Sequence, residues 1–192
     1  MVLNAIEDGF PATWQSADNL SSIRDNSLDG VLYAYGVHHL AIDKRLIAFR
    51  DIHRVLKSGG TFVLHDFKNE STMARFFKDV VDKYSITGHN FPHFDESETR
   101  QMLIEVGFRV KSMEKPDDFI FEGKNEDDVL RVCAHYIHSM YGLERLGDIT
   151  ENHTVERLLD ITDQFLGIAV NHVNSHCECR VKRNAIIFVA DK

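Results

Sequence analysis

Two histidine-containing segments stand directly after apolar runs that we expect to be strands. His38 and His39 follow the run at residues 30–35, and His65 and Asp66 end the next run. Ligands of open α/β sheets gather at the carboxyl ends of the strands, so these side chains fall where a substrate would bind. Imidazole titrates near neutral pH and can orient or deprotonate an acceptor group. His38, His39 and His65 are therefore candidate catalytic residues, with helix capping and space filling as the alternative.

His176, Cys177 and Cys179 form a third group, with the residue types of a zinc site. In a strand, alternation sends the two cysteines to one face and His176 to the other, so one ion cannot easily meet all three. The sequence also offers no evident fourth ligand. We therefore predict reduced thiols beside a buried strand, and no metal site.

The elements that must position these residues follow from the hydrophobic pattern. Residues 30–35 and 61–65 are apolar on both faces, which is typical of strands buried in a parallel sheet. Residues 41–57 have apolar side chains at helical spacing, and Gly59 and Gly60 are expected to end that helix. A strand, a helix and a strand joined by short turns make a right-handed crossover unit.

Further elements are expected along the rest of the chain. They are a helix at residues 2–8 closed by Gly9, a short strand at 12–17, a helix at 70–85, a helix from Asp95 to Val106, a strand at 108–113, helical stretches at 125–146 and 151–173, and a final strand at 184–190. Without a linker or repeat, we expect one continuous domain over residues 1–192, with a helical insertion at about 124–175.

Composition narrows the function. The chain has 192 residues, of which 43% are hydrophobic and 27% charged, as in an ordinary globular protein. A net charge of −8 argues against nucleic acid or an anionic membrane as the partner, because no basic stripe exists to bind them. No apolar run is long enough to span a membrane, and the first residues do not look like a signal peptide. Three cysteines suggest reduced thiols in the cytoplasm.

Residues 16–67 resemble the second half of a class I S-adenosylmethionine (SAM)-dependent methyltransferase. Residues 54–60 are similar to the Arg-Val-Leu-Lys-Pro-Gly-Gly run of that family, with Ser58 in place of proline, and Asp29 closes the turn where the family writes Phe-Asp. Residues 93–108 also resemble the family. The resemblance implies an α/β fold with an incomplete Rossmann-like sheet, equivalent to strands 3–7 of the family, whose last strand runs antiparallel.

The resemblance also implies where SAM would bind. In the family, an acidic residue accepts a hydrogen bond from the adenine amine, and the next backbone amide meets the ring. Ser16, Ala17 and Asp18 correspond to this segment. Counting back from Asp29 places Ser16 at the position of the acidic residue, while Asp18 is the only carboxylate nearby. An Asx-type turn cap is the competing role for Asp18. The strand tip supplies the other cofactor contacts, namely Tyr35, Gly36 and Val37. His38 and His39 resemble the histidine pair of many small-molecule methyltransferases.

The Gly-rich turn of the family has no counterpart here, since the sequence contains no Gly-x-Gly. The family strand order is 3-2-1-4-5-7-6, so a sheet without strands 1 and 2 leaves the fourth strand as an open apolar edge. A partner chain could supply the missing strands, two copies could pair as a homodimer, or the strand at Trp14 could slide against the edge. A truncated reading of a longer gene would also fit.

These observations favour a SAM-dependent methyltransferase, or the C-terminal part of one, acting on a small molecule such as a natural-product or lipid-like acceptor. The reaction would be an in-line displacement catalysed mainly by positioning. Two alternatives remain open. One is a methyltransferase-like cyclase or isomerase without SAM turnover, in which His38, His39 or Tyr35 polarises a carbonyl. The other is a non-catalytic subunit that completes a partner through the open sheet edge.

Overall fold

The structure is a computed structural model that describes residues 2–192. The chain divides into two compact units. The first contains residues up to 64 together with residues 97–112 and 188–192, and the second contains residues 65–96 and 113–187. That the whole chain acts as one domain with an insertion at about 124–175 stays a prediction.

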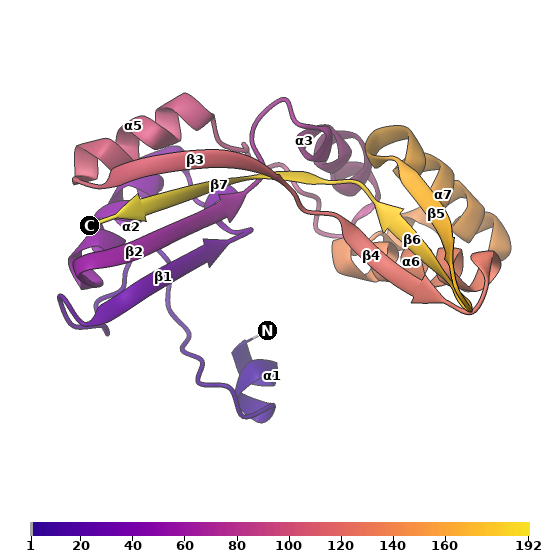
Figure 1. The fold of residues 1–192 in the computed structure, drawn as a ribbon, viewed down its shortest axis with the longest axis horizontal. Helices are drawn as coiled ribbons and strands as arrows, with labels where there is room; N and C mark the ends of the chain where they lie inside the picture. The colour runs from indigo at the N-terminus through magenta and orange to yellow at the C-terminus, as the bar shows by residue number, and fades with distance from the viewer. Residues whose placement is uncertain (1) are drawn as a thin grey trace. The chain divides into compact units, whose positions relative to one another are not determined.

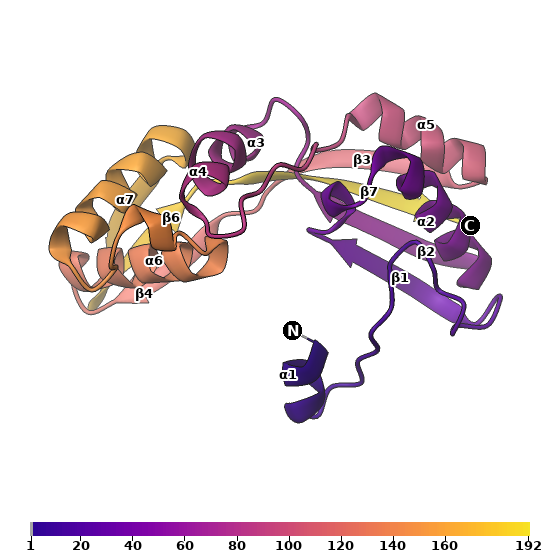
Figure 2. The same ribbon diagram turned by 180° about the vertical axis from the view of Figure 1, so that it is seen from behind.

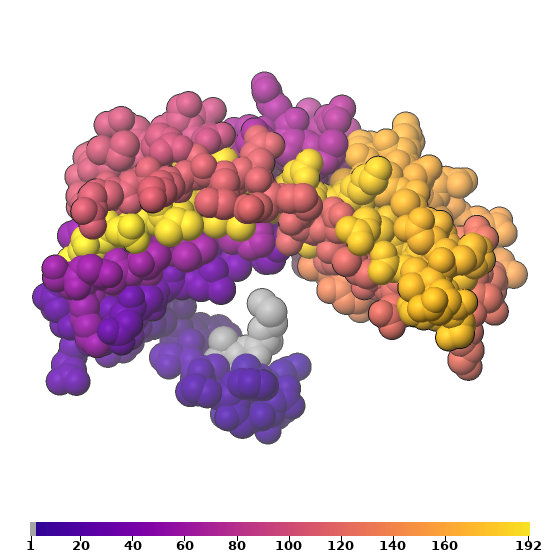
Figure 3. Space-filling model, in the orientation of Figure 1, coloured from indigo at the N-terminus to yellow at the C-terminus, as the bar shows by residue number. Residues whose placement is uncertain are grey.

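A four-stranded sheet underlies the first unit. Its order is β1-β2-β7-β3, and these strands span Leu28–Ala34, Leu56–Asp66, Asn184–Asp191 and Arg109–Pro116 (Figure 1). The amide of Gly59 donates to the Lys192 carbonyl at 3.0 Å, and the Lys192 amide donates to the Gly60 carbonyl at 3.0 Å. The start of β2 therefore pairs with the end of β7, which confirms the antiparallel last strand. Figure 3 shows this end of β7, in yellow, between the purple and pink segments.

Helix α2 (Ile42–Val55) supplies much of the core of the first unit. Phe49 and Ile52 on its inner face are buried, and the ring of Phe49 lies 5.9 Å from that of Phe62 in β2. Phe62 in turn lies 5.8 Å from Phe108, which precedes β3. Figure 2 shows α2 in front of the sheet. The other longer helix of this unit is α5 (Glu96–Val106), which precedes β3 in the chain. The helical spacing of apolar residues predicted α2 correctly, because these residues form the helix face that packs in the core.

Three expectations for this unit are corrected. Residues 12–17 form no strand, and Trp14 is 83% exposed, so the sheet contains equivalents of family strands 4–7 but not of strand 3. The helix predicted to reach residue 57 ends at Val55, because β2 already begins at Leu56. Gly59 and Gly60 consequently lie within β2, where they pair with the end of the chain.

Strand β1 was predicted to be buried on both faces, and this too is corrected. Its burial alternates, and Leu32 is 68% exposed. As the first strand in the order, β1 pairs only with β2, so one of its edges has no strand neighbour among the described residues. The open edge expected from the sequence is therefore present. The α/β class and the incomplete Rossmann-like sheet are confirmed.

Arg54 holds the segment before β1 against α2. Its guanidinium donates to the carbonyls of Leu20 (3.0 Å) and Ile23 (2.9 Å) and to the carboxylate of Asp51 (2.6 Å). Its pKa is raised above the usual value, first by the hydrogen bond with Asp51 and then by that with Asp25. These contacts give Arg54 a structural role in this unit.

The second unit has a helical stretch, a small sheet and two longer helices. Residues 72–84 form one continuous helical stretch, made of α3 (Thr72–Phe76), the π-helical segment η2 (Phe77–Val81) and α4 (Asp82–Tyr84). The longer helices are α6 (Glu126–Tyr141) and α7 (Asn152–Leu166). The antiparallel sheet has the order β4-β6-β5, with strands at Phe119–Gly123, His176–Val181 and Ile168–Val173.

The sequence did not predict this small sheet. Residues 151–173 were expected to be helical throughout, but α7 ends at Leu166, and Gly167, at φ +80°, turns the chain into β5. Pairing with β6 then fixes residues 168–173 as a strand. The helices expected before the last strand are present as α6 and α7. Strands β4, β5 and β6 were not predicted, because they form only by pairing with one another.

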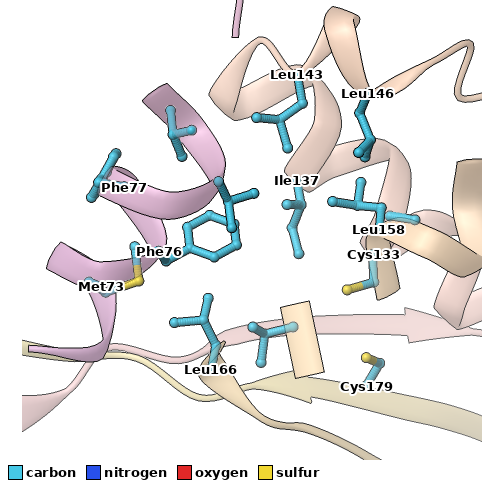
Figure 4. Packing of buried hydrophobic residues seen from close by; sticks show 14 of the residues in the cluster. Met73, Phe76, Phe77, Cys133, Ile137, Leu143, Leu146, Leu158, Leu166 and Cys179 are labelled. Atoms are coloured by element: carbon cyan, nitrogen blue, oxygen red, sulfur yellow. The ribbon is translucent and has the colours of Figure 1, made fainter. Parts of the chain in front are cut away.

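The core of the second unit lies between these helices and the small sheet (Figure 4). Phe76 is fully buried, and its ring makes edge contacts with Tyr141 at 5.5 Å and Phe165 at 6.1 Å. Figure 4 shows Met73 and Phe76 of α3 facing Ile137 of α6. Helix α6 is well delimited, because the Asn125 side chain accepts from the Asp128 amide at 2.9 Å and Gly142 ends the helix at φ +61°.

Gly123 at the end of β4 marks a close backbone approach. A Cβ there would lie 2.5 Å from the backbone nitrogen of Val129 in α6. We expect Gly123→Ala to lower the free energy of unfolding by about 1–3 kcal/mol, because the helix must shift to admit a methyl group. Chemical denaturation measures this loss. Gly30→Ala is the matched control, because a Cβ at Gly30 would make only an ordinary contact, 3.6 Å from the Thr61 carbonyl oxygen. Equal losses of unfolding free energy in the two variants would contradict the prediction.

Candidate functional site

The tip of β1 turns sharply at residues 35–37. Tyr35 has φ +52°, a left-handed conformation that is uncommon for a residue with a side chain. The hydroxyl of Tyr33 donates to the Gly36 carbonyl at 3.0 Å, and a Cβ on Gly36 would lie 2.6 Å from the Tyr33 ring. The turn therefore requires glycine at position 36. It places Tyr35, Gly36 and Val37 at the carboxyl end of β1, where the sequence predicted cofactor contacts.

The histidine pair follows in the short helix η1 (Val37–His39). His38 is 3% exposed and His39 is solvent-exposed, and their ring centroids lie 4.2 Å apart. Arg45 donates through Nε to the Leu40 carbonyl at 3.2 Å, which ties the chain after the pair to α2. The structure thus brings His38 and His39 together, with only His39 open to solvent.

Residues 16–18 form a turn near the start of α2. The Ser16 hydroxyl donates to the Asp18 carboxylate, and Lys44 Nζ lies 3.6 Å from Asp18 Oδ2. The hydrogen bond from Ser16 and the charge of Lys44 hold the pKa of Asp18 below its usual value, so this group is ionised at neutral pH. Lys44 belongs to the first turn of α2, just after the histidine pair. Ser16, Ala17 and Asp18 therefore lie at the α2 end that follows the β1 tip.

The lowered pKa of Asp18 gives a direct test of this turn. We expect Ser16→Ala to raise the pKa of Asp18 toward the ordinary value of 3.8, because the hydrogen bond that most strongly lowers this pKa is lost. Carboxyl NMR titration measures it, with Ser22→Ala as the control. Since the folded pKa is depressed, the contribution to stability exists above pH 3.8 and is lost as the pH falls through the folded pKa. An unchanged Asp18 pKa in Ser16→Ala would contradict this assignment.

His65 and Asp66 end β2 and belong to the second unit. Asp66 is fully buried, and His65 Nε2 lies 3.9 Å from Asp117 Oδ1. Asp117 is held by Arg183, whose Nη2 lies 2.7 Å from the other carboxylate oxygen. The Arg183 guanidinium also donates to the Asp117 carbonyl at 2.9 Å. His65 therefore stands beside a buried ion pair that the sequence did not reveal.

The cysteine segment behaves as strand alternation predicts. Cys177 and Cys179 are buried in β6, while His176 is partly exposed. Cys177 Sγ lies 3.3 Å from Nδ1 of His172, which is its direct cross-strand partner in β5. A hydrogen bond with Cys179, followed by burial, raises the pKa of the Cys133 thiol. The Cys133 thiol therefore stays protonated at neutral pH.

Sequence reasoning missed several residues. Lys44 and Asp117 carry no local pattern, because their partners are distant in the sequence. A cluster of rings around Phe77, made by residues 89–93, was also missed. A signal for it existed: the segment His89-Asn90-Phe91-Pro92-His93 combines aromatic and titratable side chains in a loop that begins after Gly88.

Comparison with known proteins agrees with the fold and the first unit. Residues 5–64 match the family model of a methyltransferase domain. The YcgJ protein of Bacillus subtilis has a TM-score of 0.55 at 16% identity, over 99% of this chain and 75% of that one. A SAM-dependent methyltransferase of Thermotoga maritima scores 0.53 at 16% identity, over 100% and 69% of the two chains. One from Archaeoglobus fulgidus scores 0.51 at 19% identity, over 99% and 71%.

The resemblance to class I SAM-dependent methyltransferases is thereby confirmed, in sequence over residues 5–64 and in fold over nearly the whole chain. A comparison with curated proteins found no match. Within residues 2–192, no helix is both long and apolar enough to cross a lipid bilayer.

Proposed function

We propose that this chain is a SAM-dependent methyltransferase, or the part of one that carries strands 4–7, and that it acts on a small molecule. The observation that carries the proposal is the match of residues 5–64 to a methyltransferase domain, combined with the ionised Asp18 at the α2 end that follows the β1 tip. The strand order β1-β2-β7-β3 of the first sheet supports the same proposal.

The residues present fit one end of the cofactor. An ionised carboxylate at Asp18 suits the hydrogen-bond donor of an adenine amine, and the exposed turn at Tyr35 and Gly36 allows close approach of a flat ring. The ribose and methionine ends have no counterpart in these 192 residues, since the sequence lacks a Gly-x-Gly turn. The chain therefore offers an adenine-binding end, and a complete site requires further residues.

SAM supplies a methyl group on a positively charged sulfur. The chain's own contribution would be to position the acceptor and to take its proton. His39 is exposed and lies against the buried His38, so its imidazole can accept a proton from a hydroxyl or amine acceptor while His38 fixes its orientation. Holding the reacting groups in line accounts for most of the rate in such a displacement.

A small acceptor suits the charge of the chain. The net charge of −8 disfavours a polyanionic acceptor such as nucleic acid, because repulsion would slow its approach.

The open edge of β1 supports a partner for this chain. Strand β1 is apolar, and one of its edges has no strand neighbour among the described residues. Such an edge can pair with a further strand, and Leu32 of β1 is 68% exposed. A second copy of the chain or a separate chain could supply that strand. Light scattering of the purified protein measures the mass, and Leu32→Lys is expected to dissociate a complex formed there.

Calorimetric titration of SAM and S-adenosylhomocysteine tests the proposed function. We expect both ligands to bind about 10-fold more weakly to Asp18→Asn than to the unchanged chain, because a hydrogen bond to a charged group is lost. Asp8→Asn, an exposed carboxylate in the same N-terminal segment, is the matched control. If the folded chain binds neither ligand, with or without a partner strand, methyl transfer at this site is ruled out.

A further inference from the structure

A pocket of about 540 Å³ lies entirely within the second unit. Its size is typical of sites for small organic ligands. Residues of the helical stretch 72–84 form one side, and the loop at residues 89–93 forms the other. None of the residues proposed above for methyl transfer contributes to its lining.

The wall of this pocket is built of flat rings. The ring of Phe77 is stacked on His89, with centroids 4.2 Å apart and planes 25° apart. His89 and His93 are likewise near-parallel, at 6.0 Å and 25°. Phe91 meets His89 edge-on at 5.2 Å and is 41% exposed. These rings favour an aromatic ligand, because offset-stacked and edge-to-face aromatic pairs gain free energy beyond the burial of their apolar area.

Hydrogen bonds hold the loop in place around the pocket. The carboxylate of Asp82 accepts from the His89 amide at 2.9 Å, and the Asn69 amide donates to the Phe94 carbonyl at 2.9 Å. Gly88, at φ +67°, allows the turn that brings His89 back over Phe77. Phe77 also begins a π-helical segment, a feature that often occurs at functional sites. The pocket is therefore preformed rather than made by a ligand.

Two cations stand at the rim of the pocket. Arg75 and Lys78 are three residues apart on a helical stretch, so they share one face, and both are exposed. Two acidic residues, Glu70 and Asp82, also line the pocket, but Asp82 is occupied by the loop backbone. An anionic group of a ligand would therefore gain the most binding free energy near Arg75 and Lys78. Arginine can bind a carboxylate through two parallel hydrogen bonds.

We infer that this pocket binds a flat aromatic molecule that carries a carboxylate. The ring lies against Phe91 and His89, and the carboxylate meets Arg75 and Lys78. The proposal does not rest on methyl transfer, because it uses a different unit of the chain and different residues.

Calorimetry on the full chain with three probes tests the inference: indole-3-acetate, indole-3-acetamide and cyclohexylacetate. We expect the acetamide to bind at least 10-fold more weakly than indole-3-acetate, because it lacks the charge. Cyclohexylacetate should bind about 2- to 10-fold more weakly, because it lacks the planar ring. Equal affinities for the acid and the amide, or no binding of any probe to a folded sample, would overturn the inference.

Variants locate the site. In the double variant Arg75→Gln, Lys78→Gln, indole-3-acetate should bind as weakly as the amide, while Phe91→Leu should remove the preference for a planar ring. Lys83→Gln removes a charge from the same helical stretch outside the pocket lining and should change nothing. A similar loss in Lys83→Gln would mean that general charge, not this site, causes binding. Titrating SAM into the same samples separates this result from the proposed function.

Discussion

Replacing Asp117 with alanine is expected to lower the free energy of unfolding by about 3–5 kcal/mol, because it leaves a buried guanidinium without its carboxylate. The Arg183 side chain is only 5% exposed, and Asp117 Oδ2 lies 2.7 Å from its Nη2. Arg183 is further enclosed by Phe119, whose ring centroid lies 3.5 Å from the guanidinium carbon.

Urea denaturation measures this effect. Asp127→Ala is the matched control, because Asp127 forms an ion pair with Arg131 on the exposed side of α6, and such pairs contribute about 0.3–0.5 kcal/mol. The double variant Asp117→Ala, Arg183→Met should recover part of the loss, since the uncompensated charge is gone. If Asp117→Ala costs no more than Asp127→Ala, the pair is not buried as described.

Truncating Phe76 to alanine is expected to cost about 3–5 kcal/mol, through lost apolar burial and a cavity in the core of the second unit. Phe76 is fully buried, and it contacts rings that come from α6 and α7, so the neighbours cannot easily collapse into the space (Figure 4). The loss should appear as a lower denaturation midpoint with an unchanged slope.

Val132→Ala provides the comparison for Phe76. Val132 lies on α6 but is 43% exposed, so its truncation should change stability by less than about 0.5 kcal/mol. A small loss in Phe76→Ala would mean that the second unit lacks the packed core seen in Figure 4. It would also weaken the pocket inference, because Phe77 of the pocket wall belongs to the same helical stretch and core.

The candidate chemistry is distributed over the two units. The β1 tip, the histidine pair and Asp18 belong to the first unit, whereas His65 and the ring-lined pocket belong to the second. SAM binding reports on Asp18 and the β1 tip, and the indole probes report on residues 75–93.

The strand tips and α2 could be predicted because their signals are local. Residues 30–35 and 61–65 carry continuous apolar runs, and α2 shows a 3.6-residue period. The ion pair between Asp18 and Lys44 could not be predicted, because Lys44 lies 26 positions beyond Asp18 in the sequence and the two meet only after folding. The site assignments at His38, His39 and His65 themselves remain predictions.

The sequence by itself determined the α/β class and the crossover unit, which rest on short-range patterns, and the antiparallel last strand, which rests on the resemblance to a known family. Only the tertiary structure decided that residues 12–17 form no strand and that residues 168–173 form one. It also decided the Asp117–Arg183 pair and the pocket of residues 69–93. The physical reason is the same in each case: strand pairing, charge burial and ring stacking depend on partners far away in the sequence, which local periodicity does not encode.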